Sequence, residues 1–464
     1  MPEENKKVLI FVVAYNAERT IKSVLSRIPA GDLPPGTEIL VIDDSSADAT
    51  FETAAKNRSS GGGLPVRVLR TPANQGYGGN QKIGYRYAAE NGFDVVALVH
   101  GDGQYAPEKL PELIAPALSG EADACFGSRM MEKGSALKNG MPLYKYVGNR
   151  ILTWCQNRIL GLRLTEFHSG YRVYSVSALK QVPFRYNTND FHFDTDIIIQ
   201  FALRGLKIKE LAIPTYYGDE ICYVNGIAYA WNVMVSSVTA RLCEAGLFYD
   251  RKFDVRGEED PYSLKLGYVS SHTLAIETVT PESSVLDIAC GGGGMARELE
   301  KKDCRVTGID TVETDETLFS KYIRHDLDSG ELPEGLGEYD FILALDCLEH
   351  LANPERLLAE LRENCYSNRC RIVLTAPNIG FFVTRFALLC GQFNYGRSGI
   401  LDLTHKRLFT VGSFKRMIER EGYRIEKARG IPAPFIKAMG DRIPARILTR
   451  LNAWLAFVWP SMFA

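Results

Sequence analysis

The segment VIDDSSADAT, residues 41–50, indicates the architecture of the first half of the chain, because a strand-like apolar run ends there in acids and hydroxyls. Three other apolar runs end in a similar way, with Tyr15 and Asn16, with residues 74–79 and with residues 100–104. Open parallel sheets bind ligands beyond the carboxyl ends of their strands, so four such ends predict one shared site. Taken singly, each end is also typical of a capped turn.

Apolar runs alternate with amphipathic segments from residue 7 to residue 215, which predicts an α/β layer with a mostly parallel sheet. The strands expected there are residues 8–14, 38–43, 66–70, 95–100, 124–127 and 207–213, and a helix is expected at residues 18–27. A second α/β set follows, with strands at residues 284–289, 305–309, 339–344 and 371–376 and helices at residues 295–301 and 354–362.

The two sets share no motif, and the charged segment at residues 250–260 lies between them, so we predict two different nucleotide-binding domains. The expected division has a sheet domain at residues 1–225 and a helical linker at residues 226–265. A second domain at residues 266–430 and an amphipathic tail at residues 431–464 complete it.

Composition narrows the class of protein. The chain has 464 residues, of which 45% are apolar and 24% charged, with 54 basic and 56 acidic side chains. This balance is typical of globular domains and argues against disorder and against nucleic-acid binding driven by bulk charge. The ten cysteines form no CxxC pair, which favours a reduced, cytoplasmic setting over disulfides or structural zinc. Since no uncharged apolar run reaches about 18 residues, we expect no transmembrane anchor.

Seven segments between residues 7 and 220 carry a family resemblance. In order they are VVAYNAERT, VIDDSSADAT, NQGYGGN, HGDGQYAPE, FGSR, HSGYRVY and FDTD. The series resembles the inverting family 2 glycosyltransferases of the GT-A fold, and among them the dolichol-phosphate mannose synthase type. The resemblance implies transfer of a sugar from a GDP- or UDP-sugar to a polyprenyl phosphate or a saccharide.

A nucleotide diphosphate develops negative charge as it leaves, and a hard divalent cation, Mg²⁺ or Mn²⁺, offsets that charge. Asp102 and Gln104 are the expected metal ligands, and Asp102 also belongs to the nucleotide-sugar site. The resemblance implies that Tyr15 and Asp44 hold the nucleoside and that Arg129 approaches phosphate, since a guanidinium suits that task. A surface ion pair is the alternative for Arg129.

Two positions depart from the family pattern. His100 stands where the first metal-motif aspartate is expected, and Ala17 stands where a glutamate often follows Tyr-Asn. By resemblance, Asp194 is the general base for a saccharide acceptor, or an orienting group if the acceptor is an already anionic phosphate. The alternative for Asp194 and Asp196 is a helix N-terminus, which also favours acids. Lys145 and Asn149 fall where the mannose synthase type contacts the acceptor phosphate, although solvation explains an exposed lysine equally well.

SVLDIACGGGG, residues 284–294, leads from a strand into a glycine-rich turn, where the backbone can approach a ligand closely. Asp310 ends the next strand about twenty residues on, at the spacing of a ribose-binding acid. HDLD with Asp326 and LALDCLEHLANP at residues 343–354 follow. This order resembles class I S-adenosylmethionine-dependent methyltransferases over residues 268–430. A dinucleotide oxidoreductase is the alternative, disfavoured because the G-x-G-x-x-G pattern is absent.

The resemblance implies how this second site is built. Asp310 would bind the ribose and Asp326 the adenine region, while the residues lining the methionine end would be Asp287, Gly291 and Gly293. Ala289 replaces a glycine that is common in the motif. For methyl transfer to oxygen a base helps, and the candidate catalytic residues are His350 and His405, with packing or capping as the alternative for each.

Residues 442–463 place Arg442, Arg446 and Arg450 on one helical face beside Leu, Trp and Phe. Such a helix can lie at a membrane surface, or it can pack its apolar side on the second domain and show its arginines to water.

The chain is therefore predicted to be a bifunctional enzyme at the cytoplasmic face, which transfers a sugar and methylates a glycan or precursor. The alternatives are two halves that act on unrelated acceptors, and a degenerate second domain that serves as a scaffold.

Overall fold

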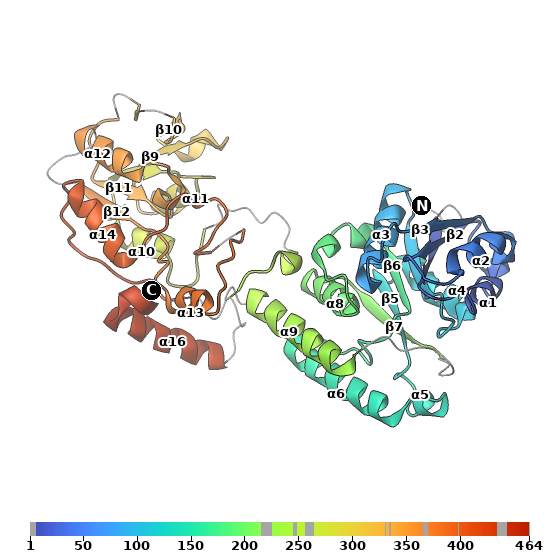
Figure 1. The fold of residues 1–464 in the computed structure, drawn as a ribbon. Coiled ribbons are helices and arrows are strands. Elements are labelled where there is room, and N and C mark those ends of the chain that lie inside the picture. The colour runs from blue at the N-terminus through green and yellow to red at the C-terminus, as the bar shows by residue number, and fades with distance from the viewer. Residues whose placement is uncertain are drawn as a thin grey trace. The chain divides into compact units, whose positions relative to one another are not determined.

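The computed structural model describes residues 6–214, 225–244, 248–255, 264–329, 331–333, 336–364, 370–397, 399–433 and 443–463. The chain divides into two compact units, each with its own sheet (Figure 1). The first unit comprises Met1–Cys243 and Asp250–Arg256, and the second comprises Glu244–Tyr249 and Gly257–Ala464. The four-part division expected from the sequence stays a prediction.

The first unit is built on a seven-stranded sheet in the order β3-β2-β1-β4-β6-β5-β7. Its strands are β1 (Lys7–Ala14), β2 (Gly36–Asp43), β3 (Val66–Arg70), β4 (Val95–His100), β5 (Ala124–Ser128), β6 (Arg172–Ser175) and β7 (Ile208–Ala212). The six strands expected from the sequence are present, within a few residues. β6, which we did not expect, runs antiparallel to both β4 and β5. With only four residues, it is too short to give a periodic signal.

Helices cover both faces of this sheet because the strands are apolar on both sides. In β1, Val8, Ile10 and Val12 face one core, while Leu9 and Phe11 face the other. The first core is closed by α1 (Ile21–Ser26), α2 (Thr50–Lys56) and α4 (Leu110–Ser119), and the second by α3 (Tyr77–Glu90) and α8 (Phe193–Leu203). The remaining α-helices described in this unit are α5 (Ser135–Lys138), α6 (Leu143–Leu160), α7 (Val176–Leu179) and α9 (Gly226–Glu244). Its short 3-10 turns are η2 (Ala30–Asp32), η3 (Arg58–Gly61), η4 (Pro107–Lys109), η5 (Phe184–Tyr186) and η6 (Arg251–Phe253).

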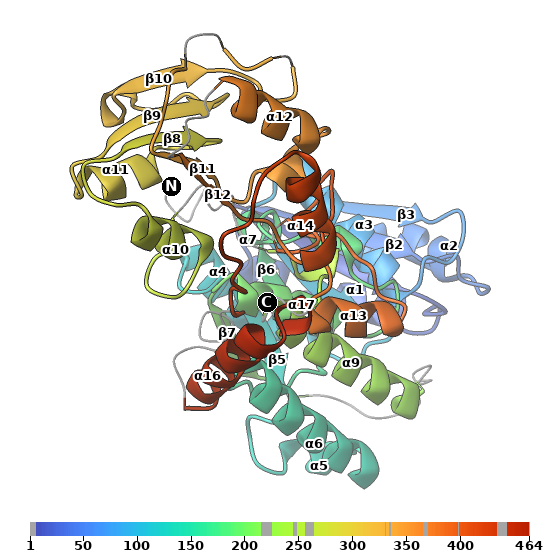
Figure 2. The same cartoon turned by 90° about the vertical axis from the view of Figure 1, so that its left-hand side faces the viewer.

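The second unit has a five-stranded sheet whose strands are all parallel, in the order β10-β9-β8-β11-β12 (Figure 2). Its strands are β8 (Ser284–Ile288), β9 (Arg305–Asp310), β10 (Lys321–Arg324), β11 (Phe341–Ala344) and β12 (Arg371–Leu374). Four were expected from the sequence. β10 was not, since KYIR is short, polar at both ends and lies at the edge of the sheet.

Alternating side chains again divide between two cores. Leu286 and Ile288 of β8 face one core, and Val285 faces the other. The first core packs against α12 (Pro354–Asn364) and α14 (Val411–Arg420), and the second against α10 (Ser271–Thr278) and α11 (Gly294–Glu300). The other α-helices described are α13 (Phe382–Leu389), α16 (Ile443–Val458) and α17 (Pro460–Phe463), and the 3-10 turns are η7 (Glu316–Leu318) and η8 (Leu348–His350).

The C-terminal helix α16 differs from the packed arrangement considered above. Among its described side chains, those of residues 446–458, Asn452 and Ala456 are buried and Arg450 is exposed. Large apolar side chains of the helix are nevertheless exposed, among them Ile447, Leu451, Trp454 and Phe457. Much of the apolar side of this helix is therefore not covered by the described residues. Arg442 lies outside the described residues.

Within the described part of the chain, no helix combines the length and apolarity that crossing a membrane requires. Eight cysteines lie in that part, and all are free thiols.

Candidate active sites

The carboxyl ends of β1, β2 and β4 lie side by side at one edge of the first sheet. Ala14 pairs with Asp43 in the β1–β2 register, and Val13 pairs with His100 in the β1–β4 register. The backbone amide of Asp44 donates to the Ala14 carbonyl over 2.9 Å, so the turns beyond these strands are tied together. β3 ends beside β2, where Arg70 pairs with Asp43, so the four strand ends expected from the sequence lie along one edge. That they form one binding site stays a prediction.

Tyr15 and Asp44 lie at this edge but differ in exposure. The Tyr15 side chain is 43% exposed, whereas Asp44 is buried. Asp44 Oδ1 accepts hydrogen bonds from Thr71 Oγ1 and from the Gln75 amide, each over 2.9 Å. Asp44 therefore fixes the loop after β3 to the turn after β2, beside an accessible aromatic ring.

Asp102 and Gln104 share a tight turn directly after β4. Asp102 Oδ1 accepts a hydrogen bond from the Gln104 amide over 2.9 Å, and Gly103 between them has a φ of 77°. Asp102 is exposed. A carboxylate and a side-chain amide oxygen are hard donors, and Mg²⁺ and similar ions are commonly held by one or two protein oxygens with phosphates and water. The donor set of this turn fits the expected ion.

His100 belongs to an aromatic cluster. Its ring packs against Tyr77 and Tyr105, with centroid distances of 5.5 and 5.1 Å, and its Nε2 lies 3.2 Å from the Tyr77 hydroxyl. Gly170 contacts this ring so closely that a Cβ there would lie 2.5 Å from it. The residue that departs from the family pattern is thus held in place by its neighbours.

Asp194 lies in the first turn of α8, with both carboxylate oxygens engaged. Tyr77 Oη donates to Oδ2 over 2.9 Å, and Gln81 Nε2 donates to Oδ1 over 3.2 Å. Burial and then the nearby Asp194 raise the pKa of Tyr77 well above its usual value, so the phenol stays protonated and remains a donor. A chain of contacts therefore runs from His100 through Tyr77 to Asp194.

Asp196, two residues on, has a different environment. It is fully buried, and Oδ1 accepts from Ser236 Oγ at 2.9 Å and from Lys252 Nζ at 3.1 Å. The Thr188 amide donates to Oδ2 over 3.2 Å. These partners come from the loop before α8, from α9 and from η6, so Asp196 holds the first unit together.

Arg129 is buried and paired with Glu166, which differs from the surface ion pair considered above. Arg129 Nε donates to Glu166 Oε1 over 2.8 Å, and its Nη2 contacts the same oxygen and the His168 carbonyl. Asn149, expected near the acceptor phosphate, instead donates to Glu166 Oε1 over 2.7 Å. Burial alone would raise the pKa of Glu166, but the Arg129 charge and these hydrogen bonds hold it below its usual value. Lys145 lies on α6, in its first turn.

In the second unit, the structure brings the glycine-rich turn and Asp310 together. Asp310 Oδ2 accepts from the Gly291 amide over 2.8 Å, and Oδ1 accepts from the backbone amides of Thr311 and Val312. The turn bends sharply, with a φ of 75° at Gly293, directly before α11. Ala289 has a φ of 58°, in the left-handed region where glycine is favoured.

Asp287 is a buried acid with an unsatisfied oxygen. Its side chain is 3% exposed, and Oδ2 has no hydrogen-bond partner among the described residues. Burial and then the nearby Asp310 raise the pKa of Asp287 to about 7. A cationic ligand would pair with the buried Asp287 carboxylate, and S-adenosylmethionine carries both an ammonium and a sulfonium charge. The residues present therefore fit the expected cofactor.

Asp326 follows β10, which is paired with β9 so that Arg324 faces Asp310. Asp326 is exposed, and its Oδ1 accepts from the Asp328 amide over 2.9 Å. It thus lies beyond the strand next to the one that ends in Asp310.

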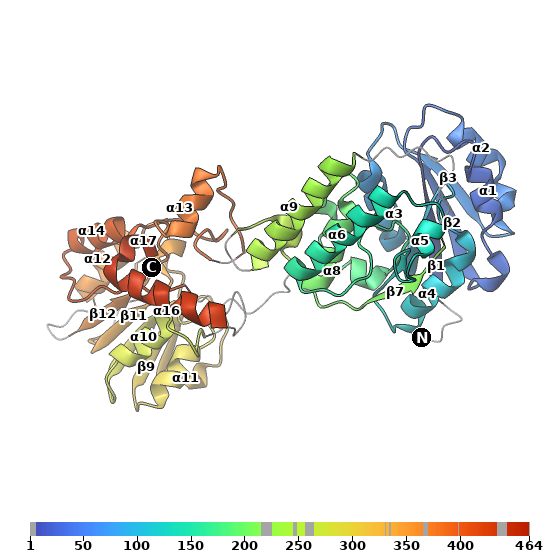
Figure 3. The ribbon, with the colours of Figure 1, turned by 90° about the horizontal axis from the view of Figure 1, so that it is seen from below.

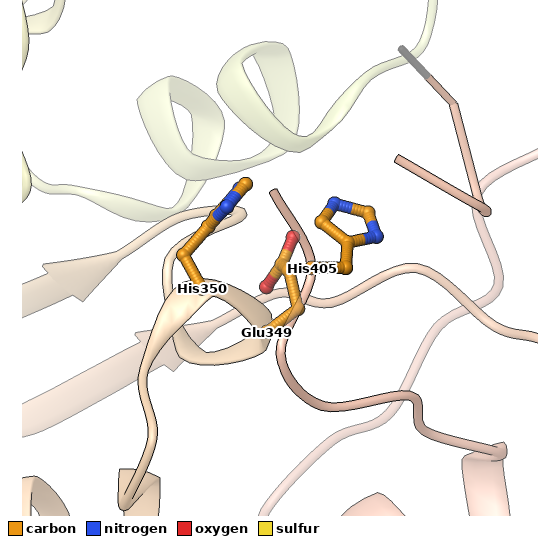
Figure 4. A group of neighbouring side chains, drawn as sticks. All are labelled: Glu349, His350 and His405. Carbon is orange, nitrogen blue, oxygen red and sulfur yellow. The ribbon is translucent and has the colours of Figure 1, made fainter. Parts of the chain in front are cut away.

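His350 and His405 are far apart in the sequence but lie together in the fold. The contact between His350 and Thr404, which spans 54 residues, brings the two histidines side by side. Their rings are edge-to-face with a centroid distance of 4.8 Å, and Glu349 completes the group (Figure 4). Burial raises the pKa of Glu349 to about 8.

Comparisons with known proteins agree with both halves of this description. The model of glycosyl transferase family 2 matches residues 9–182, and a methyltransferase-domain model matches residues 268–428. An uncharacterized protein of Methanocaldococcus jannaschii is 32% identical over 47% of this chain and 85% of its own length. The chain belongs to glycosyl transferase family 2.

Other similar proteins have named activities. This family 2 glycosyltransferase is 28% identical to the undecaprenyl-phosphate mannosyltransferase of Micrococcus luteus, over 45% of this chain and 82% of that protein. It is 27% identical to the UDP-N-acetylglucosamine–dolichyl-phosphate N-acetylglucosaminyltransferase of Methanococcus voltae, over 50% of this chain and 92% of that protein. A solved structure of glucosyl-3-phosphoglycerate synthase from Mycobacterium tuberculosis with Mn²⁺ and UDP aligns with a TM-score of 0.39 and 19% identity. The alignment covers 50% of this chain and 79% of that chain.

The fold class and the transferase class predicted from the sequence are confirmed: a GT-A domain precedes a class I methyltransferase domain. Several contacts of this glycosyltransferase were not predicted. Tyr77 lies in NQGYGGN, where an aromatic hydroxyl among glycines was an available signal. The sequence carried no signal for the role of Glu166, because its pairing with Arg129 spans 37 residues.

Proposed function

We propose that the first unit transfers a sugar from a nucleotide diphosphate sugar to a polyprenyl phosphate at the cytoplasmic face of a membrane. The observation that carries this choice of acceptor is the environment of Asp194. Both of its carboxylate oxygens already accept hydrogen bonds, from Tyr77 and Gln81, so the group is arranged to be held in position. A phosphate oxygen is anionic and needs no base, whereas a saccharide hydroxyl does.

In this reaction the acceptor phosphate oxygen forms a bond to the anomeric carbon, and the bond from that carbon to the diphosphate breaks with inversion. A Mg²⁺ or Mn²⁺ ion at Asp102 and Gln104, when bound, offsets the charge on the diphosphate. Tyr15 contacts the nucleoside, and Asp44 holds the loop that borders it. Because its guanidinium is bound to Glu166, Arg129 supports the acceptor side and reaches phosphate only if that pair opens.

The lipid nature of the acceptor is supported by the surface of α6 and α9, which lie side by side in the first unit (Figures 1 and 3). Both helices expose large apolar side chains, namely Leu143, Tyr144, Val147, Ile151 and Trp154 on α6 and Ile227, Trp231, Val235 and Val238 on α9. α6 carries one lysine and two arginines but no acid. An apolar face with basic residues matches an anionic lipid surface.

The exposed apolar side of α16 supports a second, independent contact with the same surface. Trp454 and Phe457 are 61% and 86% exposed, and the helix contains Arg446 and Arg450 without any acid. We include this tail in the proposal as a peripheral membrane contact.

For the second unit we propose methyl transfer from S-adenosylmethionine to a glycan or its precursor. S-adenosylmethionine supplies the methyl group when bound. Asp310 and the Gly291 turn form the ribose and methionine side of its site, Asp326 borders the adenine, and Asp287 neutralises the cationic end of the cofactor. The unsatisfied oxygen of Asp287 favours this proposal over a degenerate scaffold, because a scaffold gains nothing from an orphaned buried acid.

The sugar-transfer proposal is tested with radiolabelled GDP- and UDP-sugars and undecaprenyl phosphate in detergent. We expect label in the organic phase with one of the nucleotides and Mg²⁺ or Mn²⁺, and loss of that product in Asp102→Ala. Tyr77→Phe should lower the rate while leaving nucleotide binding intact. Label transferred only to soluble saccharides would contradict the choice of acceptor.

The methyltransferase proposal is tested by calorimetric titration with S-adenosylhomocysteine. Binding to the wild type and its loss in Asp310→Ala are expected. If the folded wild type bound neither S-adenosylhomocysteine nor S-adenosylmethionine, the scaffold alternative would stand.

A further inference from the structure

Glu349, His350 and His405 form a compact group of metal-binding side chains in the second unit. Each offers one ligand atom, and these atoms all lie within 4.8 Å of one another. Figure 4 shows the Glu349 carboxylate between the two imidazole rings. Two residues come from η8 and the third from the segment before α14, so the tertiary fold assembles the group.

Both histidines are oriented by a hydrogen bond at Nδ1. His405 Nδ1 lies 3.0 Å from the Ile400 carbonyl, which can only accept, so Nδ1 carries the proton. His350 Nδ1 lies 3.0 Å from Thr404 Oγ1, and that hydroxyl donates its own proton to Asp402 over 2.7 Å. His350 Nδ1 must therefore donate as well. Nε2 of each ring is therefore the nitrogen available to a metal ion, and such a bond on the other nitrogen is typical of metal-binding histidines.

Glu349 supplies an acid in need of a partner. Its side chain is 1% exposed, and Oε2 is buried with no hydrogen-bond partner among the described residues. The nearby cations are engaged elsewhere, because Lys406 pairs with Asp328 and Arg407 pairs with Glu355. A buried carboxylate oxygen without a partner has given up its hydrogen bonds to water and gained nothing in return, and a bound cation would compensate for that loss.

The position of the group is fixed from two sides. The backbone amides of Lys406 and Arg407 both donate to the Glu349 carbonyl, over 2.8 and 3.0 Å, and so hold the His405 segment against η8. η8 follows β11, which pairs with β8 so that Ala344 faces Ile288. The group therefore lies beyond the same sheet edge as the glycine-rich turn.

We propose that Glu349, His350 and His405 bind a divalent transition-metal ion, with coordination positions left open for oxygen ligands. Two imidazoles and one carboxylate are a donor set that suits Zn²⁺ and related ions. In a formed site with bonds of about 2.0–2.1 Å the ligand atoms approach one another more closely, so small side-chain rotations complete it. The open positions take hydroxyl oxygens of the molecule bound at this sheet edge. This role replaces the general-base role expected for the two histidines, and it does not depend on methyl transfer.

The experiment uses the full chain with the first-unit metal turn removed by Asp102→Ala and Gln104→Ala, so that any ion bound belongs to the second unit. The metal-stripped protein is dialysed against Zn²⁺, Mn²⁺ or Co²⁺, and the bound metal is counted by atomic emission. We expect about one equivalent of at least one ion, and visible ligand-field bands with Co²⁺.

Glu349→Gln and His405→Gln should each weaken binding by at least about 10–100-fold, since removing a ligand costs at least as much as removing its supporting partner. His192→Gln, which removes a half-buried histidine from the first unit, is the matched control and should bind as the parent does. Circular dichroism verifies that each variant is folded. No metal on the parent, or unchanged binding in both folded cluster variants, would overturn the proposal.

Discussion

Ala289 occupies a left-handed backbone conformation that suits glycine better than alanine. Its φ of 58° places the methyl group against the following carbonyl, which costs an L-residue about 1–2 kcal/mol. Glycine avoids this cost, but it makes the unfolded chain more flexible and so lowers the free energy of unfolding by about 0.4–1 kcal/mol. The Ala289→Gly variant should therefore stabilise the second unit by roughly 0.5 kcal/mol.

Urea unfolding measures this difference. Ala296→Gly, in α11 with its methyl buried, is the matched control and should destabilise instead. An Ala289→Gly variant that unfolds more easily than the wild type would show that the strain lies elsewhere in the turn.

His168 should make the stability of the first unit depend on pH in the acid range. Its Nε2 is buried and has no hydrogen-bond partner in the part of the chain that the structure describes, and burial is the main reason that its pKa falls from 6.5 to about 4. The unfolded chain thus binds a proton between these values and the folded chain does not, so stability is lost as the pH falls from about 6.5 to about 4. The loss at about pH 4.5 should be roughly 2 kcal/mol, at about 1.4 kcal/mol per pKa unit.

Other groups titrate in the same range, so the measurement compares two proteins. Denaturant unfolding of the wild type and of His168→Gln at about pH 7 and pH 4.5 isolates the histidine, since glutamine does not titrate. The variant should lose less stability on acidification. Equal losses in the two proteins would exclude His168 as the cause.

What the sequence could predict about single residues depended on how local their environment is. Asp102, Gln104 and the glycine-rich turn act within a few residues of one another, and their turns were predicted. The partners of Asp194 and Arg129 come from distant segments, so their hydrogen bonds could not be anticipated. His350 and His405 were singled out separately, but only the fold brings them together.

Among the elements, α6 and α9 offer the clearest test of lipid contact. Replacing Ile151 and Trp154 by glutamate places charges on the exposed apolar side, and each large apolar side chain contributes about 1.5–3 kcal/mol when removed from water. Binding to vesicles that contain phosphatidylglycerol should fall at least about tenfold. Flotation assays measure it.

Leu69→Glu on the edge strand β3 is the control, because Leu69 is also an exposed apolar residue but lies on the sheet. It should leave vesicle binding unchanged. If the α6 double variant floats with the vesicles as the wild type does, lipid is not the partner of this face.

The elements themselves followed sequence patterns where those patterns were long. Apolar runs such as β1 and β4 were predicted almost to the residue. β6 and β10 have only four residues each and were missed, because neither shows a periodic signal. The exposure of α16 could not be predicted either, since an amphipathic pattern specifies an apolar face but not what covers it.

For the whole molecule, the two sites should act independently. Asp102→Ala should abolish sugar transfer and leave S-adenosylhomocysteine binding unchanged, and Asp310→Ala should do the reverse, because the two residues lie in different compact units. In thermal unfolding, S-adenosylhomocysteine at a hundred times its Kd should stabilise the second unit by about 2.7 kcal/mol and leave the first unit unchanged. Loss of both activities in either variant would contradict independent sites.

The pairing of Lys252 with Asp196 determines where the chain can be divided. The chain leaves the first unit after Cys243 and returns to it for residues 250–256, which carry that lysine. An expression fragment that stops at α9 would therefore contain a buried carboxylate without its cation, a defect that typically costs about 3–5 kcal/mol. A gene designed to produce the glycosyltransferase alone must extend through Val255, even though part of the intervening sequence belongs to the other unit.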